Sequence, residues 1–316
     1  MPALSLFRGS PKTLLLQPRQ SFRPSKRLMA ELRANQPVSS SVTSAVPLYL
    51  EPEAEALYRE VLAVLNEHHA RYAVAGAVAL EKYTGIWRAT KDLDLFLEAQ
   101  HVQTALAHLQ QRGFRCEMPD PVWLAKAHRG DYFVDLISGM SNGVIMVDES
   151  WMKRAQPAIV VGIETTIIAP EDLIASKLFV TRRERFDGAD IAHIIYRTQG
   201  CLEWSRIIEL AGEHWEMLLW ALMLFRYVYP AQSDYVPAIL WDQLLSRYTQ
   251  LIQRADPNAS FRGSLVDENM FSVDVKDWGL PDLQAEFRAK RLRKQPRGCE
   301  DTPAEGSPLD TRVQGI

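Results

Sequence analysis

The sequence has few of the features that mark secreted, membrane-spanning or strongly charged proteins. Its 316 residues include only three cysteines, with no C-x-x-C pair, which argues against a disulfide framework or a cysteine-built zinc site. We therefore expect a reducing, cytoplasmic location. The net charge is only −3, so the chain as a whole has no strong electrostatic attraction for nucleic acid or an anionic membrane.

Long apolar runs are missing as well. The longest, MLLWALMLF at 217–225, falls well short of the roughly 18 residues that a membrane span needs, so we expect a buried helix there and no membrane partner. The sequence also lacks H-E-x-x-H, G-x-S-x-G and Walker-type patterns. Zinc-protease, serine-hydrolase and P-loop interpretations therefore have no support.

Composition and periodicity divide the chain into four segments. Residues 1–49 are rich in Arg, Ser and Pro with a single acid, and residues 291–316 lead from a basic cluster into a Gly-, Pro- and Ser-rich stretch, so we expect both to be disordered tails. Residues 50–168 alternate helix and strand patterns, and residues 169–290 show helical periodicity between Gly and Pro breaks. The expected architecture is an α/β (α+β) core with a mixed sheet, followed by a helical C-terminal domain.

Two aspartates lie one residue apart in GIWRATKDLDLFL, at 85–97, a stretch that otherwise alternates like a β-strand. Side chains on a strand alternate, so Asp92 and Asp94 share one face with Thr90 and Phe96. Residues two apart on one face are roughly 6.5–7 Å apart at Cα, which lets both carboxylates reach metal ions about 3.5–4 Å from each other. Such hard oxygen ligands suit Mg²⁺. The alternative is a solvent-exposed strand face without a function.

Two further features favour the metal interpretation. The strand YAVAG ends at Gly76 and a helix follows, so backbone N–H groups of the first helical turn are available to hold phosphate oxygens. A third carboxylate, Asp135, lies in the apolar strand YFVDLIS, where an unpaired buried charge is strongly destabilising. A shared metal ion would remove this penalty. The alternative is a strand-end aspartate that reaches solvent or an arginine.

These features, in this order, resemble the polymerase-beta-like nucleotidyltransferase superfamily over about residues 72–139. The stretch APEDLIASKLFVTRRERFDGADIAHII resembles the helical segment of bacterial AbiEii-like nucleotidyltransferases of the abortive-infection toxin type. The resemblance implies a nucleotidyltransferase core that moves a nucleotidyl group from a nucleoside triphosphate to an acceptor hydroxyl, with two Mg²⁺ (or Mn²⁺) ions. It implies that Asp92 and Asp94 bind both ions, that Asp135 completes the metal site beside the attacking hydroxyl, and that Gly76 and Ala77 approach the triphosphate.

The second stretch adds residues to this implied site. The family's lysine falls on Lys177 and its aspartates on Asp187 and Asp190, which implies that Lys177 and Asp190 contribute to nucleotide binding. Independently, Lys177 follows Leu173 by four residues and so projects from the apolar face of its helix, where a lysine needs an anion. That anion is either a triphosphate or Asp187 or Asp190, in an ion pair between two helices.

Three hypotheses about function remain open. The first is a cytoplasmic nucleotidyltransferase that acts on an RNA 3′ end, a protein hydroxyl or a small molecule, with a toxin role and a cognate antitoxin as partner. The second is a non-catalytic regulatory or binding protein that retains the fold. The third is an RNA-binding module, supported only by basic residues near the C-terminus, namely Arg288, Lys290, Arg291, Arg293 and Lys294.

Overall fold

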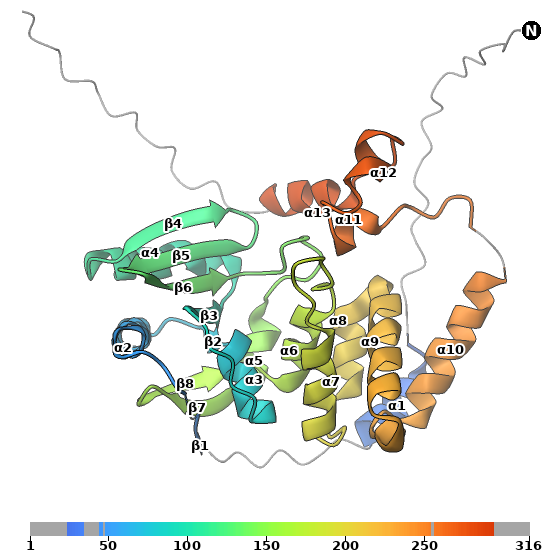
Figure 1. The fold of residues 1–316 in the computed structure, drawn as a ribbon, viewed down its shortest axis with the longest axis horizontal. Coiled ribbons are helices and arrows are strands. Elements are labelled where there is room, and N and C mark those ends of the chain that lie inside the picture. The colour runs from blue at the N-terminus through green and yellow to red at the C-terminus, as the bar shows by residue number, and fades with distance from the viewer. Residues whose placement is uncertain (1–23, 35–43, 47, 254–255, 294–316) are drawn as a thin grey trace, which may run out of the picture.

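The structure, a computed structural model, describes residues 24–34, 44–46, 48–253 and 256–293 of the chain. Within them, an eight-stranded mixed sheet occupies one half of the molecule and a group of helices the other half (Figure 1). The strands lie in the order β1-β7-β8-β2-β3-β6-β5-β4. Their bounds are β1 Ser44–Ala45, β2 Ala73–Val74, β3 Asp92–Phe96, β4 Arg115–Asp120, β5 Leu124–Arg129, β6 Tyr132–Ile137, β7 Gln156–Val160 and β8 Ile163–Ile167.

The middle of the sheet places the acidic residues side by side. β3 pairs in parallel with β6, and the register sets Asp94 beside Asp135. The alternate positions of the same strands, among them Leu93, Leu95 and Leu136, are fully buried in the core. One face of these strands is therefore apolar and the other carries the carboxylates, as the alternation of the sequence predicts.

Three helices accompany the central strands: α2 (Pro52–Glu67), α3 (Gly76–Thr84) and α4 (Ala99–Gln111). The acids Glu53 and Glu55 stabilise the first turn of α2 by facing the positive end of the helix dipole. α3 links β2 to β3 and ends at Gly85, whose φ of 71° is the left-handed conformation that glycine adopts most easily. α5 (Glu149–Arg154) follows the sheet strands β4 to β6.

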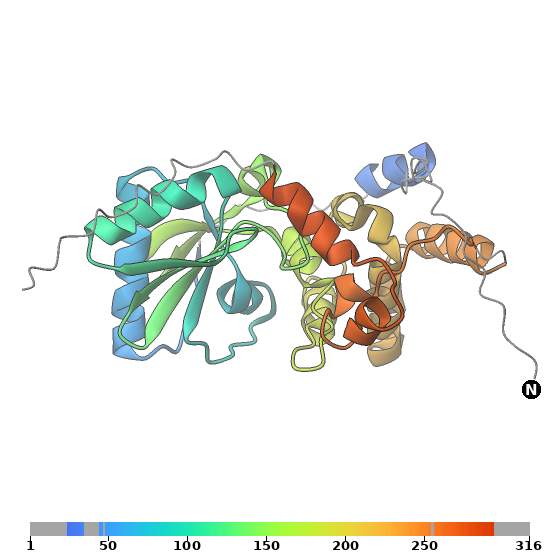
Figure 2. The same cartoon turned by 90° about the horizontal axis from the view of Figure 1, so that it is seen from above.

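The other half of the molecule is helical, and Figure 2 shows it beside the sheet. It contains α6 Pro170–Lys177, α7 Gly188–Arg197, α8 Trp204–Ala211, η1 Gly212–His214, α9 Trp215–Val228, η2 Pro230–Tyr235, α10 Ala238–Ile252, α11 Gly263–Val266, α12 Ser272–Lys276 and α13 Leu283–Leu292. The expected fold class, an α/β core with a mixed sheet followed by helices, is confirmed. None of the helices in the described part of the chain is long and apolar enough to cross a membrane.

Part of the expected N-terminal disordered tail is helical. α1 (Lys26–Ala34) packs against α8 and α10, and its residues Leu28 and Leu32 are buried. These leucines are four residues apart and form a short apolar stripe, which the average composition of residues 1–49 conceals. Disorder was therefore the wrong expectation for this stretch. At the other end, α13 continues to Leu292, slightly past the expected boundary at 290. Residues 1–23, 35–43 and 294–316 lie outside the described part.

A second difference concerns the loop of residues 178–187, because the helical periodicity of the stretch 169–186 predicts that the helix continues to residue 186. α6 ends at Lys177, and a loop follows that is closed by a β-bridge between Thr181 and Phe186. The Asp187 N–H also donates to the Val180 carbonyl oxygen over 2.9 Å. Val180 and Thr181 are β-branched and favour this extended pairing over a continued helix. The 178–187 loop faces the strands that carry the aspartates.

Candidate active site

Three aspartates converge at the centre of the sheet. Asp92 and Asp94 come from β3 and Asp135 from the adjacent strand β6, and one carboxylate oxygen of each lies within 4.8 Å of the others. Asp92 and Asp94 are half-buried, whereas Asp135 is buried. We call these residues the acidic triad. It includes all three carboxylates that the sequence singled out.

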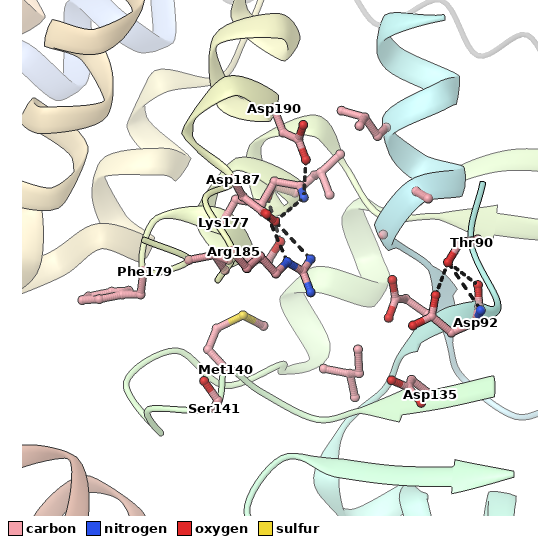
Figure 3. Close-up of a pocket in the computed structure, with 18 of the residues that line it drawn as sticks. Thr90, Asp92, Asp135, Met140, Ser141, Lys177, Phe179, Arg185, Asp187 and Asp190 are labelled. Carbon is pink, nitrogen blue, oxygen red and sulfur yellow. Dashed lines mark hydrogen bonds and ion pairs between the residues drawn. The ribbon is translucent and has the colours of Figure 1, made fainter. Parts of the chain in front are cut away.

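The acidic triad lines a cleft of about 650 Å³ between the sheet and the helical half (Figure 3). The sheet side of the cleft also includes Gly76 and Ala77 at the start of α3. The opposite side includes Lys177 on α6, Arg185 on the 178–187 loop and Asp190 on α7. Every residue that the sequence assigned to metal or nucleotide binding therefore lies in one cleft.

Mutual repulsion and burial dominate the electrostatics of the acidic triad. Burial raises the pKa of Asp94 to about 7, and the neighbouring charges of Asp92 and Asp135 add to this rise. Burial also raises the pKa of Asp135, which an ion pair with Lys126 partly offsets. The Lys126 Nζ lies 2.6 Å from the Asp135 Oδ1. The Thr90 hydroxyl donates to the Asp92 carboxylate.

Lys126 is a site residue that sequence reasoning missed. The alternative partner considered for Asp135 was solvent or an arginine, whereas the structure supplies a lysine from the neighbouring strand β5. β5 and β6 form a hairpin around Gly130, and their register sets Lys126 directly opposite Asp135. Recognition of the Gly130 turn in HRGDYF would have given this cross-strand pair.

Gly76 is fixed by its contact with the acidic triad. Its φ is +54°, and a Cβ at this position would lie 1.7 Å from the Asp94 Oδ2. The preceding residue, Ala75, donates its N–H to the Asp94 carbonyl oxygen over 2.9 Å. No side chain caps the N-terminus of α3. The first turn of α3 therefore begins directly beside Asp94, and its backbone N–H groups have no side-chain partner at the cap.

The sequence offered two kinds of partner for Lys177, a triphosphate or an aspartate. In the structure its partners are two aspartates. Its Nζ lies 2.7 Å from the Asp187 Oδ2 and 2.9 Å from the Asp190 Oδ2, and only 7% of the side chain is exposed. Arg88 binds the other oxygen of Asp190 over 2.6 Å. The ion pair between helices is thus formed, and it lies at the edge of the same cleft.

Arg185 is a further cleft residue that the sequence did not single out. Its Nε and Nη2 each lie 3.1 Å from a carboxylate oxygen of Asp187. It would have been recognised only if residues 178–187 had been read as a loop, because the position of the guanidinium depends on the turn between Thr181 and Phe186.

Two of the basic residues that supported an RNA-binding module have structural partners instead. Arg288 donates to the Ser141 carbonyl oxygen over 2.9 Å and to Asp120 over 2.8 Å. Arg291 donates to the Gly143 and Val144 carbonyl oxygens, each over 3.0 Å. These contacts hold α13 in place, and Figures 1 and 2 show this helix across the junction between the two halves. Lys294 lies outside the described residues.

The donor set of the acidic triad fits a divalent cation. All the ligand atoms are carboxylate oxygens, which Mg²⁺ and Mn²⁺ prefer. Lys126 pairs with only one of the three carboxylates. Burial first, and then the charges of Asp92 and Asp135, raise the pKa of Asp94, so repulsion between the carboxylates remains. A cation among these oxygens would relieve that repulsion.

Comparison with known proteins defines the class. Residues 54–214, which include the acidic triad and the 178–187 loop, match the family described as "Nucleotidyl transferase of unknown function (DUF2204)". The chain belongs to this nucleotidyltransferase family. No curated protein matches the chain.

Solved structures with a similar fold include three nucleotidyltransferase-like proteins. The antibiotic-resistance factor ANT(2'')-Ia is 16% identical, with a TM-score of 0.39, over 59% of this chain and 98% of its own. An antigenic nucleotidyltransferase-like protein from Paracoccidioides brasiliensis is 19% identical, with a TM-score of 0.37, over 60% and 94%. A putative nucleotidyltransferase from H. pylori is 13% identical, with a TM-score of 0.33, over 78% and 100%. These similarities concern the fold alone.

Proposed function

We propose that this protein is a magnesium- or manganese-dependent nucleotidyltransferase that acts in the cleft of the acidic triad. The observation that carries the proposal is the convergence of Asp92, Asp94 and Asp135 within 4.8 Å, beside the uncapped start of α3. Membership of a nucleotidyltransferase family supports it. In this proposal residues 50–168 form the catalytic core and residues 169–290 a helical domain that closes the other side of the cleft.

Each group of residues in the cleft has its own role in the proposed reaction. Asp92 and Asp94 would hold two divalent ions, and Asp135 would complete the site on the acceptor side. The bound ions would supply positive charge that stabilises the attacking and leaving oxygens. The N–H groups of Gly76 and Ala77 would hold phosphate oxygens, because the start of a helix attracts anions.

The transfer itself is an in-line displacement at phosphorus. The acceptor hydroxyl oxygen forms a bond to the α-phosphorus, and the bond from that phosphorus to the oxygen bridging to the β-phosphate breaks. Pyrophosphate leaves with the electron pair of the broken bond. The hydroxyl proton passes to the carboxylate of Asp135, the residue placed on the acceptor side of the site.

The acceptor is an RNA 3′ end, a protein hydroxyl or a small molecule. A cellular RNA or protein acceptor would fit the toxin role that the AbiEii-like resemblance implies, with a cytoplasmic location and a cognate antitoxin as partner. Loss of any one carboxylate of the acidic triad would favour the competing hypothesis, a non-catalytic binding protein. All three are present, which favours the enzyme.

One experiment tests the proposal and names the acceptor. The full chain is incubated with Mg²⁺ and each of the four nucleoside triphosphates labelled at the α-phosphate, together with total cellular RNA, protein or small-molecule extract. We expect label to move from one triphosphate into one of these fractions. Failure of all four triphosphates to label any fraction, with Mg²⁺ and then with Mn²⁺, would overturn the proposed function.

A further inference from the structure

Four cationic side chains line the cleft, Arg88, Lys177, Arg182 and Arg185, and they differ in how far their charge is already used. Arg182 is paired with Glu268 over 3.1 Å and donates to the Ser141 hydroxyl. Lys177 is buried and lies within 2.9 Å of two carboxylates, so its single positive charge faces two negative charges. Arg88 is bound to Asp190, which it shares with Lys177. Neither of these two residues has an unopposed charge to offer an incoming phosphate.

Arg185 is placed differently. Its side chain is 68% exposed, whereas that of its partner Asp187 is 7% exposed. Asp187 accepts from Nε and one terminal nitrogen, so two of the five guanidinium N–H groups are used and the others remain for a ligand. Figure 3 shows Arg185 reaching from the Asp187 side of the cleft toward Asp92 and Asp135. The hydrogen bond to Asp187 raises the pKa of Arg185, and the charges of Asp94 and Asp92 add smaller contributions.

Lys177 and Arg185 are connected through one carboxylate. Asp187 Oδ2 accepts from the Lys177 Nζ over 2.7 Å and from the Arg185 Nη2 over 3.1 Å, and Asp187 Oδ1 accepts from the Arg185 Nε. The buried lysine thus fixes the aspartate, and the aspartate orients the exposed guanidinium. A planar guanidinium held on one edge presents its other edge in the fork geometry that suits phosphate oxygens.

We infer that Arg185 binds the β- and γ-phosphates, the part of the triphosphate that leaves as pyrophosphate, and that Lys177 is a positioning residue acting through Asp187. This inference rests on the proposed function. It reassigns the phosphate contact that the family resemblance gives to Lys177. In this inference the Arg185 guanidinium contacts the leaving group, whereas Lys177 fixes Asp187, which orients the guanidinium.

Inorganic tripolyphosphate with Mg²⁺ is a suitable probe, since it presents the phosphate chain without a base. The test variant is Arg185→Gln, which removes the charge but leaves an amide to donate to Asp187. The matched control is Arg183→Gln, which removes the same charge from the same loop at an exposed side chain that is not among the residues lining the cleft. Affinity is measured by calorimetry on the full chain.

We expect wild type and Arg183→Gln to bind tripolyphosphate equally and Arg185→Gln to bind it about tenfold or more weakly, since charge-assisted hydrogen bonds to phosphate are lost. The melting temperature without ligand should be that of the wild type in Arg183→Gln and only slightly lower in Arg185→Gln, because the Arg185 side chain is 68% exposed. Equal affinity in Arg185→Gln, an equal loss in Arg183→Gln, or no binding by the wild type would each overturn the inference.

The positioning role of Lys177 is tested by a double-mutant cycle on the same affinity. If Lys177 acts through Arg185, Lys177→Met weakens tripolyphosphate binding in the wild type and has no further effect in Arg185→Gln. Additive losses would show an independent phosphate contact and overturn this role. Asp187→Asn, with the same expected pattern, replaces Lys177→Met if the latter does not fold.

The binding test also separates failure of this inference from failure of the proposed function. The protein could bind tripolyphosphate through Arg185 and yet transfer no label from any nucleoside triphosphate. That result would support the anion site and rule out the proposed enzyme activity. Label transfer that is unaffected in Arg185→Gln would support the enzyme activity and rule out the phosphate contact of Arg185.

Discussion

Asp94 is a carboxyl group of the cleft whose pKa is raised by its surroundings. Its pKa rises from 3.8 to about 7 in the folded protein without metal, first through burial and then through Asp92 and Asp135. A carboxyl with a raised pKa binds its proton more tightly in the folded state than in the unfolded chain. The associated stability is therefore fully present below about pH 4 and is lost as the pH rises through 7.

This sign gives a pH prediction for Asp94→Asn. In buffer with a chelator, the variant should have a higher free energy of unfolding than the wild type by on the order of 2 kcal/mol at pH 8, and the difference should vanish near pH 4. Denaturant unfolding of both proteins at a series of pH values measures it. A difference in the free energy of unfolding that is constant across this pH range would mean that the pKa of Asp94 is not raised in the folded protein.

Gly76 provides a second test at the level of single residues, with Gly85 as its matched control. Both have positive φ, but a Cβ at Gly85 meets nothing within 4 Å, whereas one at Gly76 collides with Asp94. Gly85→Ala should cost about 1–2 kcal/mol of stability and retain transfer activity. Gly76→Ala should cost about 1–3 kcal/mol more and abolish transfer, because Asp94 must move.

Unfolding free energies and label transfer for these two variants decide the point. If Gly76→Ala transferred label as fast as Gly85→Ala, the close approach of α3 to Asp94 would not matter for the reaction.

The acidic triad could be predicted from the sequence, but its counter-charges could not. Asp92 and Asp94 are marked by strand alternation, and Asp135 by its apolar neighbours, which are local signals. Lys126 depends on the register of a hairpin, and Arg185 on a turn within residues 178–187. Both depend on how segments pair, which a local pattern does not record.

Among the elements, α6, the 178–187 loop and α7 form a unit that carries Lys177 and Arg185 of the cleft. Helical periodicity correctly gave α6 and α7 but extended α6 across the loop. Lys177 at the end of α6 pairs with Asp187 of the loop and Asp190 of α7, both buried, and so holds the unit together. Periodicity predicted that this lysine faces inward. Whether it binds a phosphate or an aspartate depends on where α7 places Asp187 and Asp190, which periodicity does not show.

Removal of the Lys177 charge should destabilise this unit. Lys177→Met leaves Asp187 and Asp190 buried with one cation fewer, so we expect a loss of about 3–5 kcal/mol in the free energy of unfolding. Lys153→Met is the control, because Lys153 pairs with Glu149 at an exposed position four residues away and should contribute less than about 1 kcal/mol. Chemical unfolding measures both, and similar small losses would contradict the ion-pair role.

At the scale of the whole molecule, the cleft has an acidic side on the sheet and a cationic side on the helices. The sequence predicted both halves and their order but not how they face each other. That arrangement depends on contacts far apart in the chain, such as α3 with α6 and α7 and the Arg288 contacts of α13. Short patterns within one half hold no information about such contacts.

The division of charge predicts an order of binding. Three clustered carboxylates repel a bare triphosphate, so a nucleoside triphosphate should stabilise the protein only when Mg²⁺ or Mn²⁺ is present. At a hundredfold excess over its dissociation constant, the metal complex should add about 2.7 kcal/mol to the free energy of unfolding. Thermal unfolding with triphosphate, metal, both or neither measures this, and an equal shift without metal would place the nucleotide away from these acids.

The most direct test is transfer of label from a nucleoside triphosphate that carries it at either the α- or the γ-phosphate, catalysed by the wild type and by Asp94→Asn with Mg²⁺. The wild type should move the α-label onto the acceptor and release the γ-label as pyrophosphate, and Asp94→Asn should do neither, because one carboxylate of the metal site is gone. Wild-type turnover by Asp94→Asn, or γ-label on the acceptor, would contradict a nucleotidyltransferase built on the acidic triad.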